Sequence, residues 1–219
     1  LIDHDKLGGC FDRYELFSPN INQDPSYNVL IDYIKLQTGQ RKGDFCHEEF
    51  DANAIRQIMA DQKKSNQYLR KIGAKRLLSC AVILDDLGDD GTVVRASSSV
   101  VNSLFTRGRH LMISTFLLLQ RFRLASNTIR FNAMSILVHR LNSQADLEAI
   151  CEEFAGITNG KRNFLQIYRR AIQKPFGFLY ISTGSEPRFF SSFETEFKIH
   201  DEEDGDSARS ISDKKNVSK

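Results

Sequence analysis

Two adjacent carboxylates, Asp85 and Asp86, directly follow a run of four apolar residues at positions 81–84. A continuous apolar run of this length is typical of a strand that is buried on both faces of a parallel sheet. Ligands of open α/β sheets bind beyond the carboxyl ends of the strands. At such a place one acid can hold Mg²⁺, usually through water, and the second can polarise an attacking water molecule.

This acid pair has two interpretations. The functional one is the Walker B arrangement of P-loop NTPases, in which Asp85 holds the metal and Asp86 acts on the water. The other is a buried strand that ends in a polar turn, because L-G-D-D-G follows at residues 87–91. An apolar run followed by an acid is common, so the neighbouring motifs must decide between the two.

A second apolar run, at residues 111–119, ends at Gln120 and predicts another buried strand beside the first. Gln120 is then placed to act as a polar sensor that hydrogen-bonds a γ-phosphate or orients the water. The alternative is an ordinary strand-end side chain that faces solvent. The pairing with the two acids favours the functional interpretation.

Basic residues lie between these two runs and just after them. Arg107 and Arg109 suit phosphate chemistry, since a guanidinium group is always charged and chelates phosphate oxygens. An arginine at a subunit edge can also act on a neighbour's nucleotide. A basic helix end explains Arg107 equally well. Arg130 and Asn132 fall in a predicted strand, on one face, where they either face the same site or form a satisfied polar pair.

The composition limits the class of protein. The 219 residues are 41% hydrophobic and 26% charged, as in a globular chain with a substantial core. A net charge of +2 argues against strong non-specific attraction to nucleic acid. The four cysteines are far apart and form no C-x-x-C, which favours free thiols, a reducing compartment and no zinc site. Neither a membrane span nor a signal peptide is recognisable.

Strands and helices alternate along the chain, which predicts an α/β fold with a mainly parallel sheet flanked by helices. The predicted strands cover residues 11–17, 79–84, 111–119, 128–138, 176–182 and 188–193, and the last two form an antiparallel hairpin. The predicted helices cover residues 27–36, 48–70, 93–107, 143–154 and 162–172. Residues 1–199 form the predicted core, and the charged, Ser-rich residues 200–219 a disordered tail.

The order of these motifs resembles that of the DNA-packaging ATPases of large DNA viruses of the poxvirus type, within the FtsK–HerA superfamily of P-loop ATPases. The resemblance spans residues 11–190, and its most specific part is R-G-R-H…Q, residues 107–120. The matching stretches are F-D-R-Y-E-L-F-S-P-N, A-V-I-L-D-D, L-F-T-R-G-R-H-L-M-I-S-T-F-L-L-L-Q, I-R-F-N and P-F-G-F-L-Y-I.

The resemblance implies a RecA-like core that binds ATP and Mg²⁺ and assembles into a homo-oligomeric ring. Such a ring drives double-stranded DNA into a capsid, with capsid or portal proteins as partners, in the virion or in a viral factory of the host cytoplasm. Asp85 would be the Mg²⁺ ligand, Asp86 the catalytic carboxylate and Gln120 the sensor. Arg109 would be the arginine finger, with Arg107 as second choice. Superfamily members often have Glu where Asp86 stands.

One family motif is absent from the sequence. A phosphate loop, G-x-x-x-x-G-K-[ST], occurs nowhere in the 219 residues. It belongs just upstream of Leu1, which is not a Met, so the expectation is an N-terminally incomplete core that lacks the Walker A strand, loop and helix. Without that loop the chain would be an inactive or endogenised homologue that acts as a non-hydrolysing ring or interaction module. A third hypothesis is an unrelated α/β domain that binds a phosphorylated ligand through residues 107–110.

Overall fold

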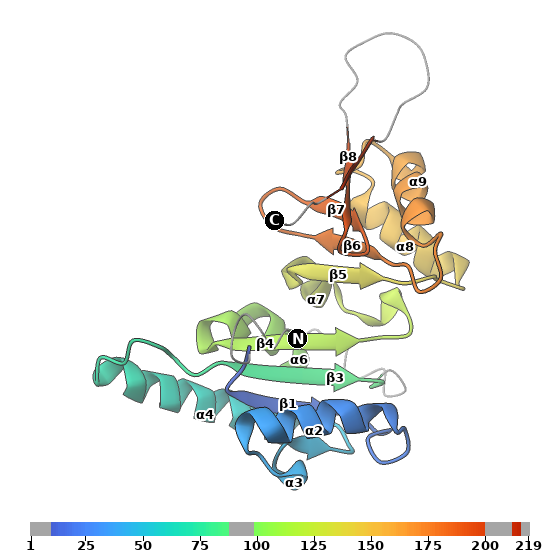
Figure 1. The fold of residues 1–219 in the computed structure, drawn as a ribbon. Coiled ribbons are helices and arrows are strands. Elements are labelled where there is room, and N and C mark those ends of the chain that lie inside the picture. The colour runs from blue at the N-terminus through green and yellow to red at the C-terminus, as the bar shows by residue number, and fades with distance from the viewer. Residues whose placement is uncertain (1–9, 88–98, 200–211, 216–219) are drawn as a thin grey trace, which may run out of the picture. The chain divides into compact units, whose positions relative to one another are not determined.

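The computed structural model describes residues 10–87 and 99–199, and the backbone of residues 212–215 (Figure 1). The chain folds into two compact units. The first unit comprises Leu1–Gln120 and Leu124–Asn132, and the second comprises Arg121–Arg123 and Ala133–Lys219. Each unit contains a sheet of its own.

The first unit has a four-stranded sheet in which all neighbours are parallel, in the order β2-β1-β3-β4. Its strands are β1 (Arg13–Phe17), β2 (Cys46–His47), β3 (Cys80–Asp85) and β4 (Ile113–Leu118). The first five residues of β3 are buried. Because β3 pairs with β4 from Cys80 and Ile113 onward, the two predicted apolar strands are confirmed as neighbours.

Helices cover both faces of this sheet. Helices α2 (Ser26–Thr38) and α3 (Lys42–Phe45) pack on the face that carries Ala81 and Ile83. Helices α4 (Ala52–Lys71), α6 (Val100–Arg107) and α7 (Asn127–Asn132) pack on the face that carries Val82 and Leu84. Side-chain caps begin two of them, since Asp51 accepts from Asn53 N at 2.7 Å and Ser99 accepts from Asn102 N at 3.2 Å.

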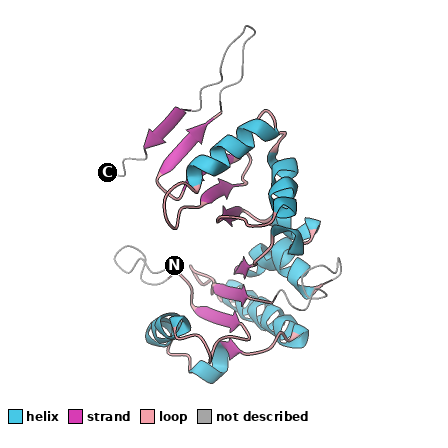
Figure 2. Ribbon diagram, turned by 90° about the vertical axis from the view of Figure 1, so that its right-hand side faces the viewer, coloured by secondary structure: helices cyan, strands magenta, loops and turns pink. Residues whose placement is uncertain are grey.

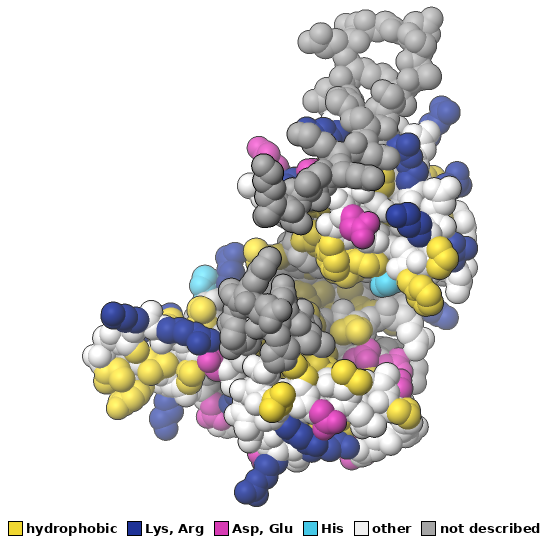
Figure 3. Space-filling model, viewed as in Figure 1, with side chains coloured by type: hydrophobic (Ala, Val, Ile, Leu, Met, Phe, Trp, Pro, Cys, Tyr) yellow, Lys and Arg dark blue, Asp and Glu magenta, His cyan; other side chains and the backbone are white. Residues whose placement is uncertain are grey.

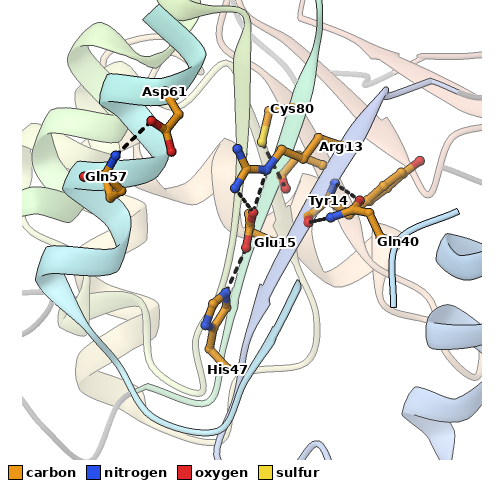
Figure 4. A network of polar contacts seen from close by, with 9 residues as sticks. Arg13, Tyr14, Glu15, Gln40, His47, Gln57, Asp61 and Cys80 are labelled. Carbon is orange, nitrogen blue, oxygen red and sulfur yellow. Dashed lines mark hydrogen bonds and ion pairs between the residues drawn. The ribbon is translucent and has the colours of Figure 1, made fainter. Parts of the chain in front are cut away.

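A buried carboxylate ties the short edge strand β2 to β1 (Figure 4). Glu15, 1% exposed, accepts hydrogen bonds from Arg13 Nε at 2.7 Å, and its Oε2 lies 2.8 Å from His47 Nε2. The His47 ring also stacks on Phe17, with ring centroids 4.2 Å apart. Because a buried carboxylate without partners is costly, these contacts are what allow Glu15 to lie inside.

The second unit has a five-stranded antiparallel sheet in sequential order. The strands are β5 (Ser135–Val138), β6 (Leu179–Ser182), β7 (Arg188–Ser191), β8 (Thr195–Lys198) and β9 (Ser212–Lys215). Helices α8 (Gln144–Phe154) and α9 (Lys161–Ala171) pack their apolar sides on one face of it (Figure 2). The predicted class, a helix-flanked parallel sheet with antiparallel strands near the C-terminus, is confirmed.

One element prediction needs correction. Residues 128–138 were expected in a strand, but Asn127–Asn132 form helix α7 and only Ser135–Val138 is extended. Ser126 begins that helix, because its Oγ accepts from Ile129 N at 3.2 Å and its carbonyl from Arg130 N at 3.0 Å. Residues 200–211 and 216–219 of the predicted tail lie outside the described residues, and the backbone of residues 212–215 forms β9. The predicted helix over 93–107 is described only from Val100, since residues 93–98 lie outside the described residues.

Within the described ranges, none of the helices combines the length and the apolar character needed to cross a membrane.

Candidate active site

The acid pair lies at the carboxyl end of the central strand. Asp85 is the last residue of β3, and Asp86 follows with φ 53°, in the left-handed region. Asp tolerates this region better than most residues, because its short polar side chain can hydrogen-bond locally. The left-handed turn therefore carries the chain away from the sheet directly after the two acids.

Both carboxylate oxygens of Asp86 accept hydrogen bonds from side-chain amides. Asn20 Nδ2 donates to Oδ2 at 2.8 Å, and Gln120 Nε2 donates to Oδ1 at 2.8 Å. Asn20 follows β1 and Gln120 follows β4, which are the two neighbours of β3 in the sheet. The two neighbours of β3 thus each bring one amide side chain to the carboxylate that follows β3.

Asp85 is held by a phenol. Tyr27 Oη donates to Asp85 Oδ2 at 2.5 Å and lies 2.9 Å from Ser18 Oγ. Burial is the largest cause, and the hydrogen bond to Asp85 the next, of the rise in the pKa of Tyr27 to about 12. The phenol therefore keeps its proton at neutral pH and acts as a donor.

These side chains line a pocket of about 330 Å³. Its described lining consists of Asn20, Asp24, Tyr27, Asp85, Asp86, Leu118, Leu119 and Gln120. The backbone N–H of Ser26, which donates to Asp24, is the main cause that lowers the pKa of that carboxyl. The described lining thus contains three carboxylates and neither Lys nor Arg.

The donor set fits a magnesium ion. Mg²⁺ takes one or two carboxylates and completes its octahedron with water and phosphate oxygens. Among the described residues no group of three or more His, Cys, Asp or Glu forms a closed metal cage, and Mg²⁺ needs none. A triphosphate alone does not fit this lining, because its negative charge would meet three carboxylates. The cations that neutralise a triphosphate must therefore come from outside the described lining.

The structure places Arg107 and Arg109 away from the acid pair of their own chain. Arg107 ends α6, and its Nη2 donates to Ser103 Oγ at 2.8 Å. Arg109 lies in the 3-10 helix η1 (Gly108–Leu111), which leads into the amino end of β4. Since β3 and β4 are parallel, Arg109 lies toward the opposite end of the sheet from the acid pair, roughly one strand length away.

Arg130 and Asn132 also lie outside the pocket, on helix α7 rather than on a strand. Arg130 donates to Ala125 O at 2.7 Å and to Asn127 Oδ1 at 2.6 Å. Asn132 Nδ2 donates to Thr128 O at 2.8 Å, within its own helix. The strand geometry expected for this pair is therefore wrong, and both residues make contacts that stabilise α7 locally.

Asn20 and Tyr27 belong to the site but were not singled out from the sequence. Asn20 could have been found, because it follows a predicted strand and strand ends meet at the same edge of a parallel sheet. Tyr27 carried no such signal. It reaches Asp85 only because residues 18–26 fold back between β1 and α2.

An acid pair and two amides at the carboxyl ends of adjacent parallel strands define an α/β protein with a ligand site at the sheet edge. The comparison with protein families then identifies the group more closely. Residues 13–184 match the family described as Pox_A32, Poxvirus A32 protein, and the chain belongs to this family. The resemblance to poxvirus-type proteins is thereby confirmed, and the match includes Asp85, Asp86, Gln120 and Arg109.

Two further proteins are similar. The uncharacterized protein 075L of Invertebrate iridescent virus 6 is 27% identical over 142 residues, which is 65% of this chain and 52% of that protein. The chain thus spans about half the length of this curated relative. Among solved structures, the genome packaging NTPase B204 of Sulfolobus turreted icosahedral virus 2, in complex with ATP-gammaS, matches with a TM-score of 0.49 and 11% identity. That match covers 80% of this chain and 79% of that one.

Proposed function

We propose that this chain is the larger, C-terminal part of an ATPase that moves double-stranded DNA into a viral capsid. The observation that carries the proposal is Asp86, held between Asn20 and Gln120 directly beside Asp85. Family membership supports it, because the match includes every one of these residues.

The described residues divide the chemistry between them. Bound Mg²⁺ supplies charge neutralisation at phosphate oxygens. Asp85 holds the ion, and Asp86 accepts a hydrogen bond from the attacking water. Gln120 Nε2 donates one of its two protons to Asp86, which leaves its other proton free to donate to a phosphate oxygen and its carbonyl oxygen free to accept from that water. The two amides fix the direction in which Asp86 presents its oxygens, which lowers the cost of orienting the water.

We infer that a strand, a phosphate loop and a helix outside the given sequence complete the site. β4 supports this inference, because among the described residues it is an edge strand of the first sheet and its apolar side chains are less buried than those of β3. Leu118 is 48% exposed, whereas the apolar residues of the central strand are buried. An exposed apolar edge is a template for a further strand. That segment would also bring a lysine, a residue type that the described lining of the pocket does not contain.

Charge localisation supports duplex DNA as the partner. The second half of α4 exposes Lys63, Lys64, Arg70 and Lys71, and Lys75 follows. Figure 3 shows Lys and Arg side chains around the end of this helix. Phosphate contacts by such side chains supply most sequence-independent DNA binding. A local basic surface thus coexists with a net charge of only +2.

The position of Arg109 supports assembly. An arginine roughly one strand length from its own acid pair is better placed to reach a phosphate in a neighbouring copy, as arginine fingers do. The proposed assembly is a homo-oligomeric ring that meets capsid or portal proteins in the virion or viral factory. The second candidate function, a non-hydrolysing ring subunit, is favoured by the lack of Lys and Arg in the described pocket lining.

ATP turnover, with and without duplex DNA, tests the proposal. The samples are residues 1–219 and a form extended by about 40 residues upstream, enough for a strand, loop and helix. We expect DNA-stimulated turnover only in the extended form. Asp86→Asn in that form should reduce hydrolysis at least about 100-fold while nucleotide binding persists. Normal turnover by this variant contradicts the catalytic assignment, and inactivity of both wild-type forms favours the non-hydrolysing subunit.

A further inference from the structure

Tyr27, in the first turn of α2, has an oxygen with two polar neighbours, Asp85 Oδ2 and Ser18 Oγ. A phenol has a single proton to give. An ionised carboxylate can only accept, so Tyr27 donates that proton to Asp85. Ser18 must then donate its own proton to Tyr27, which fixes the direction of both hydrogen bonds.

The chain of donors begins at Asn20. Its backbone N–H donates to Ser18 Oγ at 3.2 Å, so the sequence of donors runs from Asn20 through Ser18 and Tyr27 to Asp85. The side-chain amide of the same residue donates to Asp86. Asn20 therefore contacts one acid directly and the other through two hydroxyl groups.

We call the series of hydrogen bonds from Asn20 through Ser18 and Tyr27 to Asp85 the relay. Its donors are fixed by buried neighbours. Ser18 is fully buried, and α2 is anchored in the core by Ile31 and Ile34, which are 2% and 0% exposed. The turn between β1 and α2 is closed by Asp24 N, which donates to Asn20 O at 2.9 Å. A hydrogen-bond donor orients its acceptor well only when its own position is fixed by packing.

We propose that Tyr27 is a positioning residue that fixes Asp85 for a divalent cation. Its hydroxyl occupies Oδ2 and leaves Oδ1 as the oxygen that meets the cation or its bound water. This inference rests on the proposed role of Asp85 as the Mg²⁺ ligand. It adds Tyr27 and Ser18 as residues that orient that ligand from behind. Donors behind a metal ligand commonly change metal affinity by about 10- to 100-fold when they are removed.

Manganese binding tests the proposal without reference to turnover. Mn²⁺ prefers the same oxygen ligands as Mg²⁺. Electron paramagnetic resonance measures the concentration of free Mn²⁺ during a titration of the full chain. Tyr27→Phe removes only the hydroxyl and should weaken Mn²⁺ binding about tenfold. The matched control is Tyr68→Phe on α4, whose side chain is 63% exposed, and it should bind as wild type does. Equal or tighter binding by Tyr27→Phe overturns the proposal.

Ser18→Ala provides a second variant that leaves the phenol in place. It removes the donor that orients Tyr27, and we expect a smaller weakening, about threefold. Thermal unfolding of each variant checks that the fold is intact. Wild-type affinity in Ser18→Ala overturns the relay.

Terbium luminescence reports whether the ion lies next to Tyr27. The chain has six Tyr and no Trp, so Tb³⁺ emission is excited mainly through tyrosine. Tyr27→Phe should lose most of this emission and Tyr68→Phe should keep it. Undiminished emission in Tyr27→Phe places the ion elsewhere and overturns the proposal.

Asp85→Asn distinguishes the role of Asp85 as the metal ligand from the role of Tyr27 as its positioning residue. If it keeps wild-type Mn²⁺ affinity, the assignment of the metal ligand fails, and the role of Tyr27 fails with it. If it loses binding while Tyr27→Phe matches Tyr68→Phe, only the role of Tyr27 fails. Loss in both Asp85→Asn and Tyr27→Phe supports both assignments.

Discussion

Asp86 combines a left-handed backbone, at φ 53°, with two hydrogen-bonded carboxylate oxygens. Ala at this position would add backbone strain to the loss of charge, on the order of 1 kcal/mol. Asn tolerates the left-handed region nearly as well as Asp and removes only the charge. For this reason Asp86→Asn isolates the role of the carboxylate more cleanly than Asp86→Ala.

The amide of Asn20 should matter for catalysis and not for the fold. Asn20→Ala leaves Oδ2 of Asp86 without its donor, so we expect turnover in the complete protein to fall about 10- to 100-fold at unchanged nucleotide affinity. Steady-state kinetics and equilibrium binding measure the two quantities separately. Asn22→Ala, an exposed change in the same loop, is the control. Equal turnover in the two variants would contradict an orienting role for Asn20.

The four free cysteines should differ in reactivity toward a thiol reagent. Burial raises the pKa of Cys80 to about 12, so at pH 8 its thiolate is about 1 part in 10,000. Burial also raises the pKa of Cys151 and of Cys46, so exposure of the thiol decides between these two. We expect Cys10 and Cys46, which are partly exposed, to react first, and the other two only in denaturant. Mass spectrometry of labelled peptides gives the order, and early labelling of Cys80 would contradict its burial.

The candidate site was predictable from the sequence where side chains follow a strand directly. Asp85, Asp86 and Gln120 each follow an apolar run, and parallel strands end at one edge. Tyr27 was not predictable, because its position depends on a loop whose path no local pattern records. The expected placement of Arg130 beside Asn132 failed because it assumed an extended backbone.

At the scale of elements, the contact between β1 and β2 depends on Glu15. Glu15→Gln keeps the shape but leaves Arg13 and His47 without a carboxylate, so we expect a loss of about 1 to 3 kcal/mol in the free energy of unfolding. Urea denaturation measures it. Asp32→Asn removes an exposed ion pair with Lys35 and should cost under about 0.5 kcal/mol. Similar losses in both variants would show that burial of Glu15 does not strengthen the contact.

A long periodic pattern of apolar residues, or a clear capping residue, predicted most helices correctly. A short alternation of apolar and polar residues led to the wrong prediction of a strand. The apolar stripe of α4 and the capping Ser143 of α8 both predicted helices that the structure contains. By contrast, T-I-R-F alternates over only four residues, a window in which helix and strand are not distinguished. In this segment Ser126 stabilises the start of a helix, because its Oγ accepts a hydrogen bond from Ile129 N.

At the scale of the whole assembly, subunit mixing tests whether Arg109 acts across an interface. Arg109→Ala and Asp86→Asn should each be inactive in the complete protein. In a 1:1 mixture, about a quarter of the interfaces pair an intact acid with an intact arginine, so activity should recover toward that fraction. Mixing each variant with itself is the control. Absence of recovery would contradict a role for Arg109 in a neighbouring site.

The order of the strands in the first unit could not be predicted from sequence patterns. Alternation of strands and helices predicts a parallel sheet but not that the order is β2-β1-β3-β4. The order depends on long-range packing, such as Asn66, whose amide donates to Leu78 O at 3.0 Å and to Leu111 O at 3.3 Å. One buried amide thereby connects the segments that enter β3 and β4.

The pairing of β1 with β3 has a consequence for synthesis. Arg13 is the partner of Cys80, so β1 leaves the ribosome well before its central neighbour. At bacterial or eukaryotic rates of translation the interval is on the order of several seconds. During it the apolar residues of β1 have only local contacts, and long-range parallel pairing is intrinsically slow. The sheet of the first unit therefore cannot form around its central strand until β3 emerges, and until then the apolar residues of β1 are a site for aggregation.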